Sequence, residues 1–303
     1  MRETNHKKNR LIVLVGPTGI GKTDLSIELA FHLKTVIISC DSRQIFKELI
    51  IGTAVPSVSQ LSAVKHYFIA SHSIYDYFNA SMYECEVNEL LLKLFKTNQS
   101  VLMVGGSGMY VDAVCKGIDD LPSIDPDVRE KLITQYENEG ISSLRQQLKK
   151  LDPDYYNKVD LKNAKRILKA IEVCMMTGKP YSSFLTHSKK DRNYEQLKIG
   201  LNMNRGELYD RINQRVDGMI ASGLIEEARE LYKDKHLNSL NTVGYKELFD
   251  YFDNKISLTF AIDLIKRNSR RYAKRQLSWF MRDKEIKWFH PTEKQEISDY
   301  LSK

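Results

Sequence analysis

The sequence predicts an α/β fold, in which a parallel sheet is covered by helices on both faces and the core is interrupted by an inserted all-helical domain. Two observations predict the sheet. Short apolar runs recur along the chain, each continuous rather than alternating, and helical patterns separate them. The insertion is predicted by a third observation, because residues 127 to about 177 are helical in pattern and strand signals are absent there. The length of 303 residues fits about two domains at roughly 150 residues each.

The elements follow from apolar period, Gly and Pro positions and capping residues. We expect strands at residues 11–15, 35–40, 66–70, 101–104, 196–201 and 286–289. In the core we expect helices at residues 22–33, 81–96, 206–221, 224–233 and 257–280, and Ser81 with Glu84 matches a capping box that would open the second of them. The predicted core comprises residues 1–121 and 191–303, and residues 122–190 form the insertion.

Composition excludes several classes of protein. Hydrophobic residues make up 42% and charged residues 28%, which excludes a collagen or a wholly disordered chain. The four cysteines are widely spaced, which argues against a disulfide scaffold and fits a reducing cytoplasm. No apolar run approaches the length of a membrane span, so we expect a cytoplasmic protein without membrane contact, and a monomer.

The net charge of +7 is concentrated near the C-terminus. Residues 262–290 contain nine Lys or Arg against three Asp or Glu. Arg267, Arg270, Arg271 and Lys274 fall at i, i+3, i+4 and i+7 of one predicted helix, and Lys162, Lys165, Arg166 and Lys169 repeat that spacing in the insertion. Such stripes suit a polyanionic partner, although a charge run by itself is more often a solvated face.

One motif carries chemistry without ambiguity. Residues 16–23 match G-x-x-x-x-G-K-[ST] between a predicted strand and a predicted helix, so the core is expected to resemble the P-loop NTPases. The glycines turn backbone N–H groups inward, and the helix N-terminus adds positive potential for a phosphate chain. The phosphate-binding residues are Gly16, Pro17, Thr18, Gly19, Ile20, Gly21, Lys22 and Thr23. Lys22 would reach the terminal phosphates, and the Thr23 hydroxyl would hold Mg²⁺.

Two further loops are expected at the same sheet edge, where ligands of parallel sheets bind. Asp41 directly follows the second predicted strand and could hold Mg²⁺, act as a general base, or cap the next turn. Gly105–Gly108 would either let a substrate approach the backbone closely, with the Ser107 hydroxyl offered to it, or form a glycine turn that binds no ligand. Arg211 and Arg215, spaced i and i+4, could neutralise a leaving phosphate or form an exposed pair.

These motifs together resemble one family. The segments are GPTGIGKT, ISCDSRQIF, IGTAVP, VGGSGMY, RINQRVDGMIASGLIEEAR, VGYKE and AKRQLSWF. In this order they resemble the tRNA dimethylallyltransferases, also called tRNA isopentenyltransferases, from residue 11 to about residue 289. The resemblance implies transfer of a dimethylallyl group from dimethylallyl diphosphate to N6 of the adenosine immediately 3′ of the tRNA anticodon. The products would be N6-(dimethylallyl)adenosine and diphosphate.

The resemblance also implies roles for particular residues. Asp41 would accept the N6 proton, Ser107 would contact the base or the donor, and Arg215 would help to hold the diphosphate. The insertion would close over the anticodon stem-loop. The implied tRNA-binding residues are Asp41, Ser42, Arg43, Gln44, Ser107, Arg129, Lys165, Arg166, Ile167, Leu168, Lys169, Asn241, Thr242, Val243, Gly244, Tyr245, Lys246, Arg275 and Arg282.

Two positions depart from the family pattern. Ser107 stands where bacterial members usually have Thr, and Asn241 stands where some members have Arg, which would weaken one phosphate contact. Two rival functions remain open from the sequence. One is a P-loop enzyme that acts on a small molecule, including an isopentenyltransferase for free adenine nucleotides. The other is a catalytically silent RNA-binding protein that uses the P-loop as a switch.

Overall fold

The computed structural model describes residues 8–119, 121–122, 125–186 and 190–302. The chain forms two compact units, one of residues 1–115 with 191–303 and the other of residues 116–190. From the sequence we placed the start of the insertion at residue 122, six residues later. Among the described residues, no helix has the length and apolar content needed to span a bilayer.

The first unit is built on a six-stranded, fully parallel sheet with the strand order β3-β2-β4-β1-β5-β6. The strands are β1 (Arg10–Val15), β2 (Ile37–Ser39), β3 (His66–Tyr67), β4 (Ser100–Gly105), β5 (Glu195–Leu201) and β6 (Lys287–Phe289). The predicted α/β fold with a parallel sheet is therefore confirmed. The central strands β1 and β4 are buried almost throughout, which explains why their sequences are continuously apolar.

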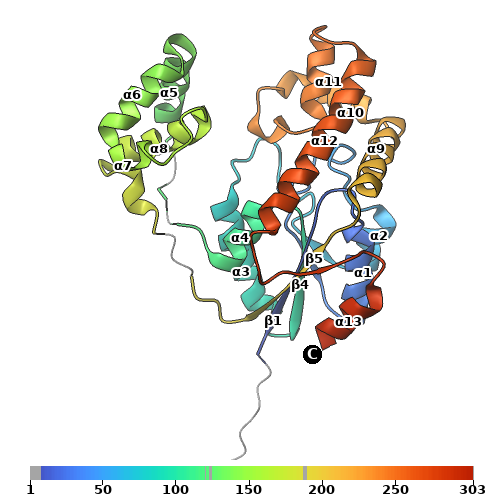
Figure 1. Cartoon of the computed structure of the whole chain (residues 1–303). Helices are drawn as coiled ribbons and strands as arrows, with labels where there is room; N and C mark the ends of the chain where they lie inside the picture. Colours follow the sequence, from blue (N-terminus) through green and yellow to red (C-terminus); the bar gives the residue numbers. More distant parts are fainter. Residues whose placement is uncertain (1–7, 120, 123–124, 187–189, 303) are drawn as a thin grey trace, which may run out of the picture. The chain divides into compact units, whose positions relative to one another are not determined.

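Helices cover both faces of this sheet, with α3 and α4 on one side and α1 and α13 on the other (Figure 1). The helices of the unit are α1 (Lys22–His32), α2 (Val58–Ala63), α3 (Ala80–Leu94), α4 (Gly108–Lys116), α9 (Arg205–Ala221), α10 (Leu224–Glu230), α11 (Tyr245–Phe252), α12 (Leu258–Phe280) and α13 (Lys294–Ser302), with 3-10 turns η2 (Tyr232–Asp234) and η3 (Asn238–Leu240). Helices α9 to α12 also share a separate apolar core, which includes Val216, Leu224, Tyr245 and Ile265.

The predicted capping box at Ser81 is wrong. Helix α3 begins one residue earlier, and its N-cap is Asn79, whose side chain accepts hydrogen bonds from the N–H groups of Ser81 and Met82. Asn is as good an N-cap as Ser, and here it precedes the pattern that the sequence offered. Helices α2, α11 and α13 were not predicted, and each is shorter than ten residues, so that few turns are available from which to read a period.

The second unit is helical. It contains α5 (Pro126–Glu139), α6 (Ile141–Leu151), α7 (Pro153–Tyr156), α8 (Ala164–Thr177) and the 3-10 turn η1 (Tyr181–Phe184). Leu132, Leu144, Leu148, Ile167 and Ile171 form its own buried core. A core of this kind, separate from that of the sheet, is what an inserted domain needs in order to fold as a unit.

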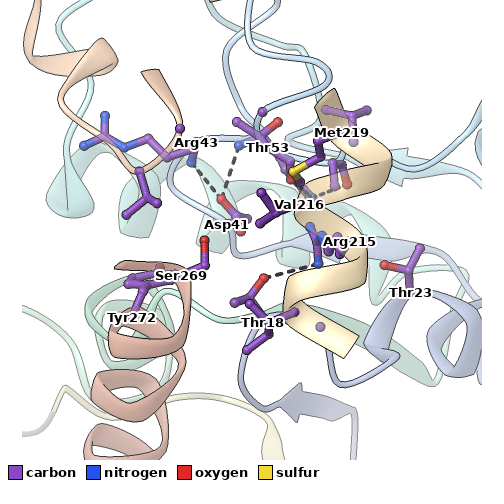
Figure 2. A pocket seen from close by; sticks show the side chains of 18 of the residues that line it. Thr18, Thr23, Asp41, Arg43, Thr53, Arg215, Val216, Met219, Ser269 and Tyr272 are labelled. Carbon is purple, nitrogen blue, oxygen red and sulfur yellow. Dashed lines mark hydrogen bonds between the residues drawn. The ribbon is translucent and has the colours of Figure 1, made fainter. Parts of the chain in front are cut away.

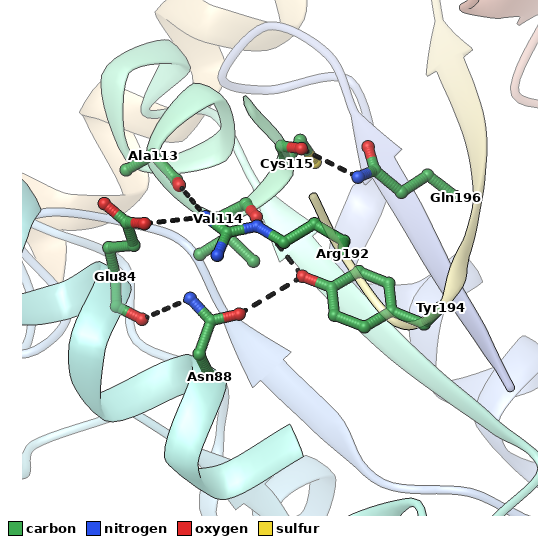
Figure 3. Close-up of polar contacts among 8 residues, drawn as sticks. All are labelled: Glu84, Asn88, Ala113, Val114, Cys115, Arg192, Tyr194 and Gln196. Atoms are coloured by element: carbon green, nitrogen blue, oxygen red, sulfur yellow. Dashed lines mark hydrogen bonds and ion pairs between the residues drawn. The ribbon is translucent and has the colours of Figure 1, made fainter. Parts of the chain in front are cut away.

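The chain leaves the first unit after α4 and re-enters it before β5, and these two points are tied together (Figure 3). Three side chains of the returning segment donate to successive carbonyls in the last turn of α4: Arg192 to Ala113, Tyr194 to Val114 and Gln196 to Cys115. Arg192 also forms a buried ion pair with Glu84 of α3, at 2.7 Å. These hydrogen bonds close the core at the point where the insertion leaves and returns.

Candidate active site

A large pocket opens at the carboxyl ends of the central strands, where the loops after β1 and β2 and the end of β4 meet helices α9 and α12. The sequence predicted that Lys22, Asp41 and Arg215 would meet at this edge, and all three line the pocket. Figure 2 shows Thr18, Asp41 and Arg215 around it, with Tyr272 of α12 on the opposite side from α9.

The loop after β1 has the geometry of a phosphate cradle. Gly16, Gly19 and Gly21 have backbone φ values of 154°, 80° and 97°, which residues with a Cβ rarely adopt. Gly21 is also the N-cap of α1, so the loop presents the unpaired N–H groups of that helix to the pocket. The residue types and the backbone conformation therefore both fit a bound phosphate chain.

Lys22 is held in this loop by the loop's own carbonyls. Its Nζ donates to the oxygens of Gly16 and Pro17, at 2.9 and 2.8 Å. Burial, followed by the charge of Arg215, lowers the pKa of Lys22 to about 8. Two cations that share a desolvated site favour an anion between them, because it would relieve both effects.

Arg215 supplies the second cation. Its Nη1 donates to the Thr18 hydroxyl at 3.2 Å, so α9 is tied to the phosphate loop. Burial lowers the pKa of Arg215, and the charge of Asp41 opposes that shift. Arg211, one turn earlier, also lines the pocket but is exposed. Of the two roles that the spacing left open, Arg215 fits phosphate neutralisation, and Arg211 lies at the solvent-facing side of the same pocket.

Asp41 has the turn-capping role considered for it, and it also lines the pocket. Its Oδ1 accepts the N–H groups of Arg43 and Gln44, at 2.9 and 3.2 Å, as a turn-capping Asp does. Within the described part of the chain, Oδ2 has no hydrogen-bond partner, and Asp41 lines the pocket. The turn therefore fixes the carboxylate by one oxygen and leaves the other for a ligand.

Ser107 lies directly behind this turn and is 8% exposed. Its Oγ accepts the Ser42 N–H at 2.9 Å and donates to the Ser42 hydroxyl at 3.2 Å. Tyr272 of α12 lines the pocket, and burial raises its pKa to about 12. No pattern in the sequence pointed to Tyr272, because a tyrosine within a basic helix resembles an ordinary packing residue.

The glycines of the second loop serve a different purpose from the one predicted. We expected Gly106 and Gly108 to let a substrate approach. A Cβ on Gly106 would instead collide with the Gln276 amide, and a Cβ on Gly108 would collide with the indole of Trp279. Both partners lie on α12. The small residues therefore allow a helix, not a ligand, to come close.

Sequence reasoning also missed how the remaining wall of the pocket, Gly52–Pro56, is held. Glu227 of α10 accepts the N–H groups of Ile50, Ile51 and Gly52 at 2.8–3.1 Å, and the Tyr245 hydroxyl at 2.6 Å. From the other side, Gln44 Nε2 donates to the carbonyls of Thr53 and Ala54. A carboxylate that accepts consecutive N–H groups is visible only in three dimensions, since Glu227 lies 175 residues from Gly52.

The chain is similar to a known protein family along most of its length. A model of the family described as IPP transferase matches residues 44–283. The tRNA dimethylallyltransferase 1 of Bacteroides fragilis is 56% identical over 291 residues, which cover 96% of this chain and 97% of the relative. The chain belongs to the IPP transferase family. The tRNA dimethylallyltransferase of Flavobacterium johnsoniae is 51% identical and is covered to 96%.

Solved structures of the family have the same fold. The full-length tRNA isopentenylpyrophosphate transferase of Bacillus halodurans is 35% identical, with a TM-score of 0.70, and the match covers 97% of this chain and 96% of that one. The crystal structure of a eukaryotic dimethylallyltransferase acting on tRNA superposes on this chain with a TM-score of 0.79. At 23% identity, it supports the fold alone.

Most of the residues of the first unit that the family resemblance implied to bind tRNA lie around the pocket. In the first unit, Asp41, Ser42, Arg43, Gln44, Asn241, Thr242, Val243, Gly244, Lys246 and Arg275 line the pocket. Arg43 is bonded to the carbonyls of Asn238 and Ser239. Tyr245 is fully buried, and Arg282 is exposed, with its guanidinium stacked 4.4 Å from the Trp279 ring.

The helical unit places its candidates unevenly. Lys165 and Arg166 are exposed on the first turn of α8, and Lys169 is half-buried, which lowers its pKa. Ile167 is fully buried, and Leu168 packs against the same core, so these two side chains stabilise the unit. Arg129 forms a bidentate pair with the buried Glu172, at 2.8 and 3.2 Å. Lys162 precedes α8, so the predicted stripe loses its first member.

Helix α12 divides its basic residues in a similar way. Arg267, Arg271 and Lys274 are exposed, whereas Arg270 is half-buried, donates to Asn213 Oδ1 at 2.5 Å and lies over the Tyr209 ring. Arg270 therefore joins α12 to α9 and is not a member of the solvent-facing stripe. Spacing alone could not separate it from its neighbours, because i, i+3 and i+4 positions share a broad face.

Proposed function

We propose that this protein is a tRNA dimethylallyltransferase, which transfers a dimethylallyl group from dimethylallyl diphosphate to N6 of the adenosine immediately 3′ of the anticodon. The observation that carries the proposal is the pocket itself. It joins a phosphate cradle with two desolvated cations to a carboxylate that has one unoccupied oxygen. Relatives over 50% identical along nearly the whole chain bear the name tRNA dimethylallyltransferase.

The cationic side of the pocket suits the departure of the diphosphate. N6 of adenine is a poor nucleophile because its lone pair is delocalised into the ring, so the donor has to ionise towards an allylic cation. Lys22, Arg215 and the inward N–H groups of the phosphate loop would stabilise the charge that develops on the leaving diphosphate. The P-loop then holds a prenyl donor instead of hydrolysing a nucleotide.

The acceptor side is served by Asp41 and Ser107. Oδ2 of Asp41 would take the N6 proton as the C–N bond forms, while Oδ1 keeps the carboxylate in place through the N–H groups of Arg43 and Gln44. A base stacked in an RNA loop cannot enter such a pocket, so the adenosine has to be flipped out of its stack. Ser107 lies close enough to the Asp41 turn to orient the base or the donor.

Magnesium fits the same residues. In the described part of the chain, no three His, Cys, Asp or Glu side chains are grouped to hold a metal ion. Mg²⁺, however, commonly keeps several waters and binds through substrate phosphates with one or two protein oxygens. Thr23 lines the pocket beside Lys22, and its hydroxyl would supply one such oxygen. When bound, Mg²⁺ would neutralise charge on the diphosphate.

Exposed basic residues on α12 and α8 would bind the phosphates of the anticodon stem-loop. On this proposal the enzyme works as a cytoplasmic monomer. Asn241, exposed at the pocket, would bond a tRNA oxygen in place of the arginine contact that some members make.

The test keeps the donor, dimethylallyl diphosphate, and compares two acceptors, tRNA and free adenine nucleotides. Purified protein is incubated with Mg²⁺, dimethylallyl diphosphate and unmodified tRNA, and the tRNA nucleosides are analysed by mass spectrometry. We expect N6-(dimethylallyl)adenosine at the position 3′ of the anticodon, and none when the tRNA is replaced by free adenine nucleotides. Modification of free nucleotides alone, or phosphate release from ATP without prenyl transfer, would contradict the proposal.

A further inference from the structure

Gln276 contacts both the loop after β1 and the loop after β4. It is on α12, its side chain is 5% exposed, and it lines the pocket. Its Oε1 accepts the Thr18 N–H of the phosphate loop at 2.8 Å. Its Nε2 donates to the Gly106 carbonyl of the second loop at 2.9 Å. One amide thus bridges two loops that follow neighbouring strands, β1 and β4.

The surroundings show that this bridge is a built feature. The absent side chain at Gly106 is what leaves room for the amide, because a Cβ there would overlap Gln276 Nε2. A side-chain amide can accept from an N–H through its oxygen and donate to a carbonyl through its nitrogen at the same time, without carrying a charge. A buried residue with both hydrogen bonds made is costly to replace by one that leaves either loop group unpaired.

Each end of the bridge is next to a group that the proposed reaction uses. Thr18 also receives the hydrogen bond of Arg215, so the donor-side end is tied to the cation that would hold the diphosphate. Gly106 precedes Ser107, which bonds the turn that carries Asp41. The spacing between leaving group and base therefore depends on the spacing between these two loops.

We infer that Gln276 is a positioning residue, which sets the distance between the diphosphate cradle and the acceptor side of the pocket. The inference rests on the proposed function and deepens it. Misplacing reactive groups by about 1 Å can cost on the order of 10²-fold in rate. Loss of the bridge should therefore lower kcat while each substrate still binds to its own loop.

The first test replaces Gln276 by Met, which has similar length and no hydrogen-bonding amide. We expect Gln276→Met to lower kcat by about 10–100-fold, while the Kd for tRNA and the Kd for dimethylallyl diphosphate stay within about threefold of wild type. The matched control is Gln99→Met, at an exposed position whose side chain forms no hydrogen bond with the described residues. A kcat within threefold of wild type would overturn the inference, as would loss of both binding events together.

The second test uses Gln276→Glu and gives a readout that a merely structural residue would not move. A protonated carboxyl can accept from the Thr18 N–H and donate to the Gly106 carbonyl, whereas the ionised form can only accept. Burial raises the pKa of such a carboxyl. The activity of Gln276→Glu relative to wild type should therefore rise several-fold as the pH is lowered from 8 to 6. The ratio for Gln276→Met should stay flat.

These outcomes separate the inference from the proposed function. If wild-type protein transfers no dimethylallyl group, the proposed function has failed. If wild type turns over and the two Gln276 variants show the same flat pH ratio to wild type, the positioning role is overturned and the function stands. Low-pH rescue confined to Gln276→Glu supports the role, because only that variant regains the donor to Gly106.

Discussion

The two glycine-rich loops of the pocket look alike in sequence and differ in purpose. In the first, Gly16, Gly19 and Gly21 have positive φ values, which a loop that turns its N–H groups towards a phosphate requires. In the second, Gly106 and Gly108 have no such φ value, and their missing side chains make room for Gln276 and Trp279 of α12. The first loop has the backbone conformation that a phosphate ligand requires, and the second has the small residues that the packing of α12 requires.

The largest expected effect concerns the ligand-shaped loop. Lys22→Met should lower turnover by about 10²–10³-fold, the size expected when one group that stabilises a leaving anion is removed. Its desolvated charge works against folding below pH 8, so the melting temperature at pH 7 should not fall. Steady-state kinetics and thermal unfolding check both statements. A large drop in melting temperature would contradict the assignment of this loop to the ligand.

The second prediction reverses this pattern in the loop shaped by packing. Gly106→Ala should destabilise the protein by about 1–3 kcal/mol, because its Cβ overlaps Gln276. The control is Gly218→Ala on α9, where nothing lies within 4 Å and the change should stabilise the helix by about 0.5–1 kcal/mol. Chemical unfolding gives both values.

A double variant sharpens this prediction. Adding Gln276→Ala should recover part of the stability that Gly106→Ala loses, since it removes the atoms that the new Cβ would meet. If the losses of stability of the two single variants were strictly additive, contact with Gln276 of α12 would not be the reason for a glycine at position 106.

The third prediction uses the pKa of Lys22. Because that pKa is lowered to about 8, the free protein loses the Lys22 charge as the pH rises past 8, and donor binding then has to restore a proton. The affinity for dimethylallyl diphosphate without tRNA should therefore fall between pH 7 and pH 9, by up to about tenfold per unit above the pKa. Lys22→Arg stays charged and should flatten the curve. Calorimetric titration measures both, and an equal slope in the variant would assign the effect to another group.

The smallest expected effect lies on the solvent side of α12. Arg271 is exposed, whereas Arg270 is bonded to Asn213. Arg271→Gln should weaken tRNA binding modestly and reduce the slope of log K against log salt by about 0.7–0.9, the contribution of one phosphate contact. Binding curves at several salt concentrations test this. A slope unchanged from wild type would return Arg271 to the ordinary solvated surface.

Sequence reasoning succeeded where a feature is local. The strand β1, the loop after it and Lys22 lie within 13 residues, so spacing alone predicted them. The position of Asp41 followed from the rule that ligands bind at the carboxyl ends of parallel strands. The parallel sheet and the helical insertion followed from continuous apolar runs and from their absence.

Features that depend on distant partners were not predictable. Gln276 contacts Thr18 across 258 residues, and Glu227 contacts Gly52 across 175. The family resemblance grouped Ile167 with its basic neighbours as tRNA-binding, yet its side chain is buried in the core, because a helix turns successive residues to different faces. Nothing in the local pattern indicates which partner a buried polar side chain will find.

The central claim is that one carboxylate accepts the proton from the adenine amine while the cradle holds the leaving diphosphate. Asp41→Asn tests it most directly, because Asn keeps an oxygen for the N–H groups of Arg43 and Gln44 and cannot act as the base. In single-turnover reactions with radiolabelled donor and saturating tRNA, transfer should slow by about 10²-fold or more with tRNA affinity unchanged. A transfer rate close to that of wild type would contradict the account.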